Sequence, residues 1–218
     1  MTSRTFSSGR LRLSAISVLS ASVLALSACS SGEGPKNGSS DGATPSASAS
    51  ATASPSATPT PTPVYKPADA KGKAQNVPVP VKPALADKNS KEGVEAFTKY
   101  WFQVLSYAYE TGNTALMESV SGPDCRFCNG LRDNVKNAWQ GQRWIVGGKI
   151  QTPTVKPVFR PGAKSQQATI QVIQQEISIY KATGTLYQAA TRASNRASQA
   201  VVRFDSTGWT VIDLGLIR

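Results

Sequence analysis

NSKEGVEAFTKYWFQVLSYAYETG, residues 89–112, is the segment around which the rest of the chain must fold. Its apolar residues recur every three or four positions, which predicts a helix from Asn89 to Glu110. Asn89 can cap this helix with Glu92 three residues later, and Gly112 is a natural C-terminal stop. Aromatic side chains widen the apolar surface beyond one stripe, so we expect the helix to be covered on more than one side.

The residues after this helix predict two shorter helices and then a sheet. The shorter helices are predicted at 114–120 and 124–139, where apolar positions keep helical spacing. From Trp144 onward the apolar residues alternate, a period typical of strands. The predicted strands span 144–150 with a continuation at 155–159, then 166–180, 199–204 and 208–216, and residues 182–198 are predicted as a loop. The glycine pair Gly147-Gly148 predicts a bulge or bend in the first of these strands. Three helices followed by about four strands indicate an α+β domain, with the helices packed on a curved antiparallel sheet.

The N-terminus has the pattern of an export signal. Basic residues precede a 14-residue apolar run, residues 13–26, and Leu26-Ser27-Ala28-Cys29 follows. This predicts a signal peptide over residues 1–28, with a run shorter than the roughly 20 residues of a membrane span. The ending resembles the lipobox of bacterial lipoproteins, which implies two acyl chains such as palmitate on Cys29. Two chains anchor a protein stably to the outer face of the cytoplasmic membrane.

The rest of the chain divides by composition. Residues 29–87 are rich in Ala, Ser, Thr and Pro and poor in large apolar residues, so we predict a disordered tether extending into the cell wall. Residues 88–218 have the size of one domain. They carry 16 Lys and Arg against nine Asp and Glu, scattered without a run. This excess fits either an ordinary basic surface or contact with anionic envelope polymers, and no motif indicates nucleic acid.

Two cysteines remain for the domain, Cys125 and Cys128. In an oxidising compartment a structural disulfide is the expected state. The alternative hypotheses are a thiol oxidoreductase, since a cysteine at a helix N-terminus has a lowered pKa, and a metal site. The chain has no histidine and offers one cysteine pair, so a tetrahedral metal site lacks ligands and no cofactor is predicted. The absence of histidine also excludes Ser-His and Cys-His catalysis.

Aromatic and acidic residues provide the candidate site. Tyr100, Trp101 and Tyr107 on the long helix are either core residues or the lining of a pocket for a small apolar ligand. Asp213 lies in an apolar strand in phase with Trp209, so it either projects into the concave side of the sheet or pairs with Arg203 or Arg218.

Two resemblances to known families add to these expectations. A long aromatic helix on a bent sheet resembles the nuclear transport factor 2-like (SnoaL-like) cone fold, whose domains often dimerise and whose enzymes often use an aspartate base. A second resemblance, to an uncharacterised family of actinobacterial lipoproteins, implies a location and a shape without a reaction. It rests on Tyr100-Trp101-Phe102, Tyr107 to Gly112, Cys125-Arg126-Phe127-Cys128, Trp144, Gly147-Gly148 and Gly208-Trp209-Thr210-Val211.

The leading hypothesis is a non-enzymatic, lipid-anchored surface protein. Its domain is expected to bind a small apolar ligand or a cell-envelope partner, and a homodimer is compatible with the cone fold. The alternatives are a cone-fold enzyme that uses Asp213 and a thiol oxidoreductase that uses Cys125 and Cys128.

Overall fold

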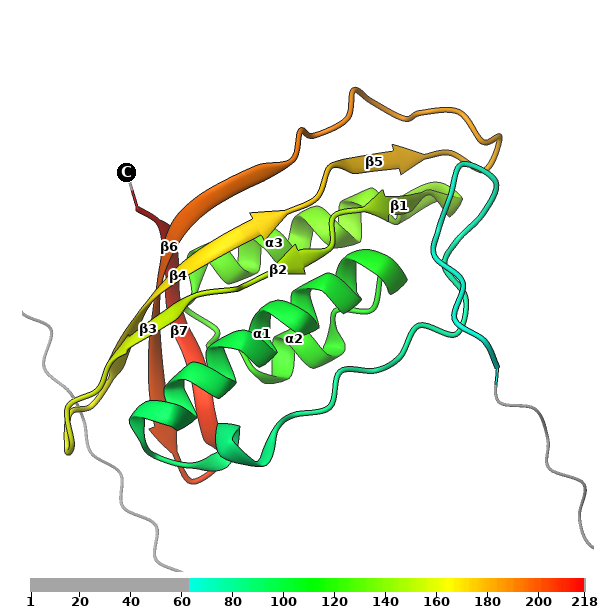
Figure 1. Ribbon diagram of the computed structural model, residues 1–218. Coiled ribbons are helices and arrows are strands. Elements are labelled where there is room, and N and C mark those ends of the chain that lie inside the picture. Colours follow the sequence, from blue (N-terminus) through cyan, green and yellow to red (C-terminus); the bar gives the residue numbers. More distant parts are fainter. Residues whose placement is uncertain (1–62, 218) are drawn as a thin grey trace, which may run out of the picture. The chain divides into compact units, whose positions relative to one another are not determined.

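The structure, a computed structural model, describes residues 63–217. The predicted signal peptide at 1–28, the predicted lipidation of Cys29 and the tether as far as residue 62 lie outside the described residues. Along the described chain, three α-helices come first and seven strands follow, which confirms the α+β prediction (Figure 1). Within this part of the chain, no helix combines the length and the hydropathy needed to cross a membrane.

The long helix forms as predicted, with one change at its start. Helix α1 spans Lys91–Thr111, and Ser90 rather than Asn89 is its N-cap, since the Ser90 hydroxyl accepts the Gly93 N–H at 3.1 Å. Gly112 ends the helix in a left-handed conformation with φ 73°. A side chain there would also collide with the Trp139 ring, so a glycine is required on both grounds.

Two shorter helices follow at the predicted places. Helix α2 spans Ala115–Ser119 and helix α3 spans Arg126–Ala138, and the 3₁₀ turns η1 and η2 cover Ala84–Asp87 and Gln140–Gln142. Cys125 is the N-cap of α3, which therefore starts two residues later than predicted.

The strands outnumber the four or so expected because the first predicted strand and its continuation form three strands and the predicted strand at 166–180 forms two. The strands are β1 (Trp144–Gly147), β2 (Ile150–Gln151), β3 (Val155–Val158), β4 (Gln166–Gln174), β5 (Ile177–Tyr180), β6 (Ser194–Asp205) and β7 (Gly208–Leu216). Gly147 and Gly148 have φ values of 79° and 74° and separate β1 from β2. A Cβ on Gly147 would lie 2.2 Å from the Glu176 carbonyl oxygen, so this bend depends on glycine.

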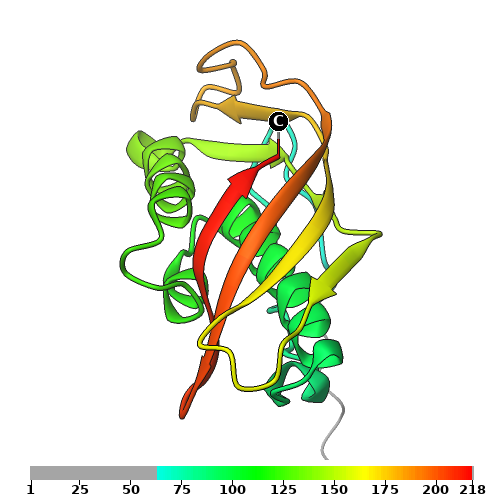
Figure 2. The ribbon, with the colours of Figure 1, turned by 90° about the vertical axis from the view of Figure 1, so that its left-hand side faces the viewer.

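All described strand pairs within the sheets are antiparallel. The five-stranded sheet has the order β2-β4-β6-β7, with β3 also pairing with β4, and β1 and β5 form a separate ribbon. The sheet is curved and α1 runs along its concave side, which is the cone-like arrangement predicted (Figure 2). Strand β6 begins at Ser194, so the predicted loop at 182–198 is shorter than expected.

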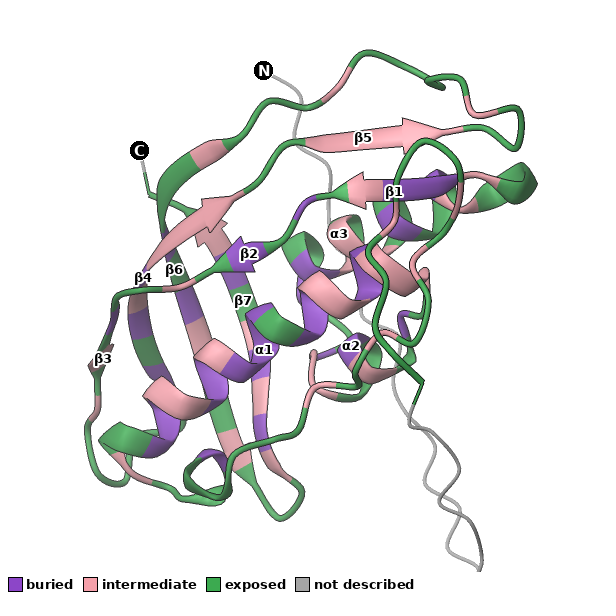
Figure 3. Cartoon of the chain, turned by 45° about the vertical axis from the view of Figure 1, so that its right-hand side comes forward, coloured by how far each residue is buried: buried purple, intermediate pink, exposed green. Residues whose placement is uncertain are grey.

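The core lies between α1 and the concave side of the sheet. Helix α1 contacts β1, β2, β3 and β4, and its buried residues face them (Figure 3). Each large apolar side chain buried here stabilises the domain by about 1.5–3 kcal/mol. The largest fully buried apolar side chains are Trp101, Phe97, Leu105, Met117, Ile170, Val94, Val104, Val135, Val202 and Val211.

Residues 63–87, predicted as part of the disordered tether, are structured instead. Lys66 and Gln75 pair as in a hairpin, and the Trp144 indole N–H donates to the Asp69 carbonyl oxygen at 2.8 Å. The Trp209 indole N–H donates to the Lys88 carbonyl oxygen at 2.9 Å. The indole donors come from residues distant in sequence, so the composition of the segment and of the adjoining Lys88 does not reveal these contacts.

Candidate functional site

The four residues predicted to line a pocket do not come together. Trp101 is 1% exposed in the core, and its indole N–H donates to the Ser121 hydroxyl at 2.9 Å. Tyr100 is also buried and borders a surface depression beside Pro83, whereas Tyr107 is half-buried on α1.

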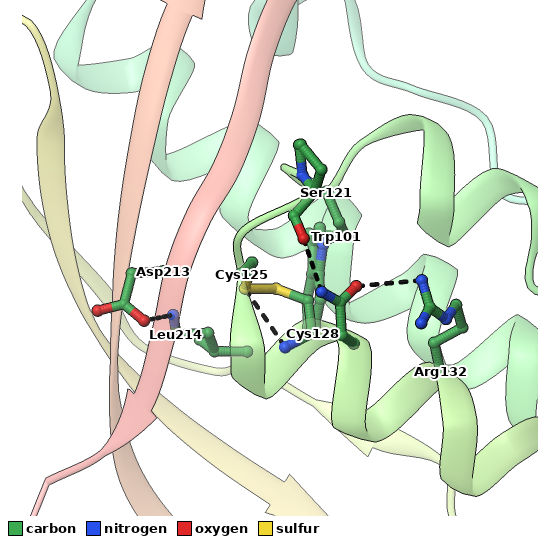
Figure 4. Close-up of a disulfide and its surroundings, with 9 residues drawn as sticks. Trp101, Ser121, Cys125, Cys128, Arg132, Asp213 and Leu214 are labelled. Carbon is green, nitrogen blue, oxygen red and sulfur yellow. Dashed lines mark hydrogen bonds between the residues drawn. A yellow bond between two sulfur atoms is a disulfide. The ribbon is translucent and has the colours of Figure 1, made fainter. Parts of the chain in front are cut away.

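Asp213 lies on the outer face of the sheet, so the prediction that it projects into the concavity is wrong. Strand β7 has a bulge, because Val201 pairs with Asp213 while Val202 pairs with Val211. The extra residue shifts the alternation, so that Leu214 turns inward and Asp213 outward. Its carboxylate accepts the Leu214 N–H at 2.9 Å and points away from α3 (Figure 4). The predicted pairing with Arg203 is absent among the described ion pairs, where Arg203 contacts Asp205 at 3.8 Å, and the alternative partner Arg218 lies outside the described residues.

Cys125 and Cys128 form a disulfide whose Cα atoms lie 5.3 Å apart. The Cys125 sulfur also accepts the Cys128 N–H at 3.3 Å, so the bridge is part of the N-terminal cap of α3 (Figure 4). The two residues are 0% and 1% exposed. Thiol–disulfide exchange requires an attacking thiolate to reach a sulfur atom, and this burial therefore favours a structural role.

A cavity lined by residues other than the four predicted ones lies between α3 and the β1–β5 ribbon. Its volume is about 680 Å³, within the range of small-molecule sites. The end of α1 and the loop after β5 close two further sides. The loop is attached to β5 at both ends, through pairing of Ile177 with Thr191 and of Tyr180 with Leu186. The lining residues are Tyr109, Leu131, Asn134, Val135, Asn137, Ala138, Gln140, Arg143, Ile145, Gln174, Ile177, Ile179, Tyr187, Gln188 and Thr191.

This cavity has an apolar floor and a polar rim. Ile177 and Ile179 are half-buried on one face of β5, and Leu131 is half-buried on α3. The exposed rim is rich in carboxamides, which both donate and accept hydrogen bonds. The rim carboxamides are Asn134, Asn137, Gln140 and Gln188. The arrangement suits a ligand with an apolar body and a polar end, which differs from the purely apolar ligand predicted.

Tyr109 forms the buried end of the cavity. It is 7% exposed, and burial raises the pKa of its hydroxyl to about 12, with a hydrogen bond to the Gln174 side chain acting in the opposite direction. At neutral pH the hydroxyl is therefore protonated and uncharged.

Replacing Tyr109 with phenylalanine is expected to reduce the loss of stability at alkaline pH. The folded pKa of about 12 exceeds the ordinary value of 10.0, so the folded domain holds this proton more tightly. The contribution is complete below about pH 10 and is lost as the pH rises towards 12, a change of about 2–3 kcal/mol. Urea unfolding of both proteins between about pH 9 and pH 12 measures how the free energy of unfolding changes with pH. An equal change for wild type and Tyr109→Phe would contradict the buried position of the Tyr109 hydroxyl.

The sequence analysis gave Arg143 and Tyr187 no role in a binding site. The available signal was Tyr187, an isolated aromatic residue in a polar loop. Among the described residues, no cluster of three or more His, Cys, Asp or Glu side chains is arranged to hold a metal ion.

Comparison with known proteins places the domain in a family. A family of unknown function, DUF6318, matches residues 63–215. The chain belongs to the DUF6318 family. The DUF6318 match begins at residue 63, where the described structure also begins. No curated protein matches the sequence.

Solved structures resemble the DUF6318 domain only distantly. The intermembrane space region of the chloroplast protein ARC6 is 10% identical, with a TM-score of 0.45 over 59% of this chain and 96% of that chain. An uncharacterised protein with a cystatin-like fold from Caulobacter vibrioides is 12% identical, with a TM-score of 0.39 over 58% of this chain and 91% of that chain. A putative calcium/calmodulin dependent protein kinase II association domain from Xanthomonas campestris is 13% identical, with a TM-score of 0.34 over 64% of this chain and 96% of that chain.

Proposed function

We propose that this chain is a lipid-anchored surface lipoprotein whose DUF6318 domain binds a small ligand. The observation that carries the binding role is the cavity of about 680 Å³ between α3 and the β1–β5 ribbon. The proposed anchor is Cys29, and residues 29–62 form the proposed tether between the outer face of the cytoplasmic membrane and the domain.

The cavity supports binding better than catalysis. Asp213, the carboxylate of the enzymatic hypothesis, lies on the opposite face of the sheet from the core. Cys125 and Cys128, the residues of the oxidoreductase hypothesis, form a buried disulfide. The half-buried isoleucines of β5 instead offer apolar surface to a ligand, and binding there would remove that surface from water.

Replacing Ile179 with tryptophan is expected to fill the cavity and weaken ligand binding. The larger ring would occupy the floor, so the affinity for the neutral dye Nile red should fall at least about tenfold. The measurement is dye fluorescence with full-length protein carrying Cys29→Ser, which keeps the chain free of acyl groups.

The matched control is Ile173→Trp. Ile173 is a half-buried isoleucine on β4 that does not line the cavity. It should leave dye binding unchanged. Equal dye affinity for both variants, each folded by its thermal unfolding transition, would reject the cavity as the binding site.

A further inference from the structure

The charge of the cavity is one-sided. Of its lining residues, Arg143 alone carries a full charge, and no Asp or Glu is among them. The lining therefore carries one positive charge, at Arg143, and is otherwise neutral. This charge favours a ligand with an anionic group.

Arg143 is held in position by contacts that occupy two of its guanidinium N–H groups. Its Nε donates to the Ala138 carbonyl oxygen at 3.4 Å, and one terminal nitrogen donates to the Asn137 carbonyl oxygen. The guanidinium carbon lies 4.1 Å from the centre of the Tyr187 ring. These contacts fix the side chain between the end of α3 and the loop after β5.

The remaining donors of Arg143 can take an anion. A guanidinium has five N–H donors, and the two contacts above use two of them. Among the ion pairs of the described residues, none includes Arg143. A planar, fixed guanidinium with free donors suits a carboxylate or a phosphate, because both anions accept two parallel hydrogen bonds.

The apolar floor defines the other part of the ligand. Ile177, Ile179 and Leu131 present half-exposed apolar surface within the same cavity as Arg143. We propose that the cavity binds a single-chain anionic amphiphile, with its acidic head on Arg143 and its hydrocarbon chain against these three residues. This inference rests on the proposed binding function and specifies its ligand class.

Paired probes test the inference with full-length protein carrying Cys29→Ser. Decanoate and decanol have the same chain and differ in charge, and decyl phosphate separates a preference for carboxylate from one for phosphate. Isothermal titration is expected to show decanoate or decyl phosphate binding at least about tenfold more tightly than decanol. Arg143→Gln should remove this preference, so that decanoate, decyl phosphate and decanol bind with similar affinity, and Arg143→Lys should retain part of it.

The control for nonspecific charge is Lys149→Gln, an exposed cation that does not line the cavity. It should preserve the preference for the anionic probes. Equal affinity for all three probes in the wild type, or a preference that survives Arg143→Gln, would overturn the anionic inference and leave the binding function standing. If none of the three probes binds, both the anionic inference and the proposed binding of ligands at the apolar floor of the cavity are overturned.

Discussion

Replacing Trp101 with alanine is expected to lower the free energy of unfolding by about 3–5 kcal/mol. The side chain is 1% exposed at the centre of α1, so its removal leaves a large cavity where the helix meets the rest of the core. It also removes the hydrogen bond from the indole N–H to the Ser121 hydroxyl, which joins α1 to the segment before α3. Urea unfolding followed by circular dichroism measures the change.

Gln103→Ala is the control for this prediction. Gln103 is exposed on the same helix, two residues further along, and its replacement should change stability by less than about 0.5 kcal/mol. If Trp101→Ala cost no more than this control, Trp101 would not be part of the core. The assignment of the aromatic helix as the central element of the fold would then fail.

Replacing Cys29 with serine is expected to abolish lipid attachment. The sulfur of Cys29 is the proposed site of acylation, and a serine side chain supplies no thiol for that bond. Because two acyl chains hold a protein stably on a bilayer, the loss is all-or-none rather than graded. Incorporation of an alkyne-labelled palmitate into the expressed chain, followed by detergent-phase partitioning, gives the measurement.

The control for this experiment removes the other two cysteines. A Cys125→Ser/Cys128→Ser variant should incorporate the label as the wild type does, because these residues form the disulfide of the domain. Label that persists in Cys29→Ser, or that disappears in the double variant, would contradict acylation at Cys29.

The sequence predicts the elements well where the signal is local. Helix α1 is identified by its apolar spacing and ends at Gly112, as expected. Its start moved by one residue because Asn89 and Ser90 are adjacent residues that both can cap, and the structure uses Ser90. The bend at Gly147 and Gly148 was also visible, since paired glycines interrupt an alternating pattern.

Features that depend on pairing between distant segments could not be predicted. The orientation of Asp213 follows from a bulge, and the register of β7 against β6 decides where the extra residue lies. The cavity has the same origin, because Arg143 and Tyr187 meet only once β1 and β5 pair. The ordered segment at 63–87 likewise depends on the indole donor of Trp144, which bonds to the Asp69 carbonyl oxygen.

Native mass spectrometry of the full-length chain, exported to an oxidising compartment, asks whether the cavity holds a ligand. The protein should carry an extra small-molecule mass that leaves on denaturation, and Ile179→Trp should lack it while Ile173→Trp keeps it. A wild-type protein with no non-covalent mass beyond its chain and acyl groups, or an extra mass that Ile179→Trp retains, would contradict a ligand-binding cavity between α3 and the β1–β5 ribbon.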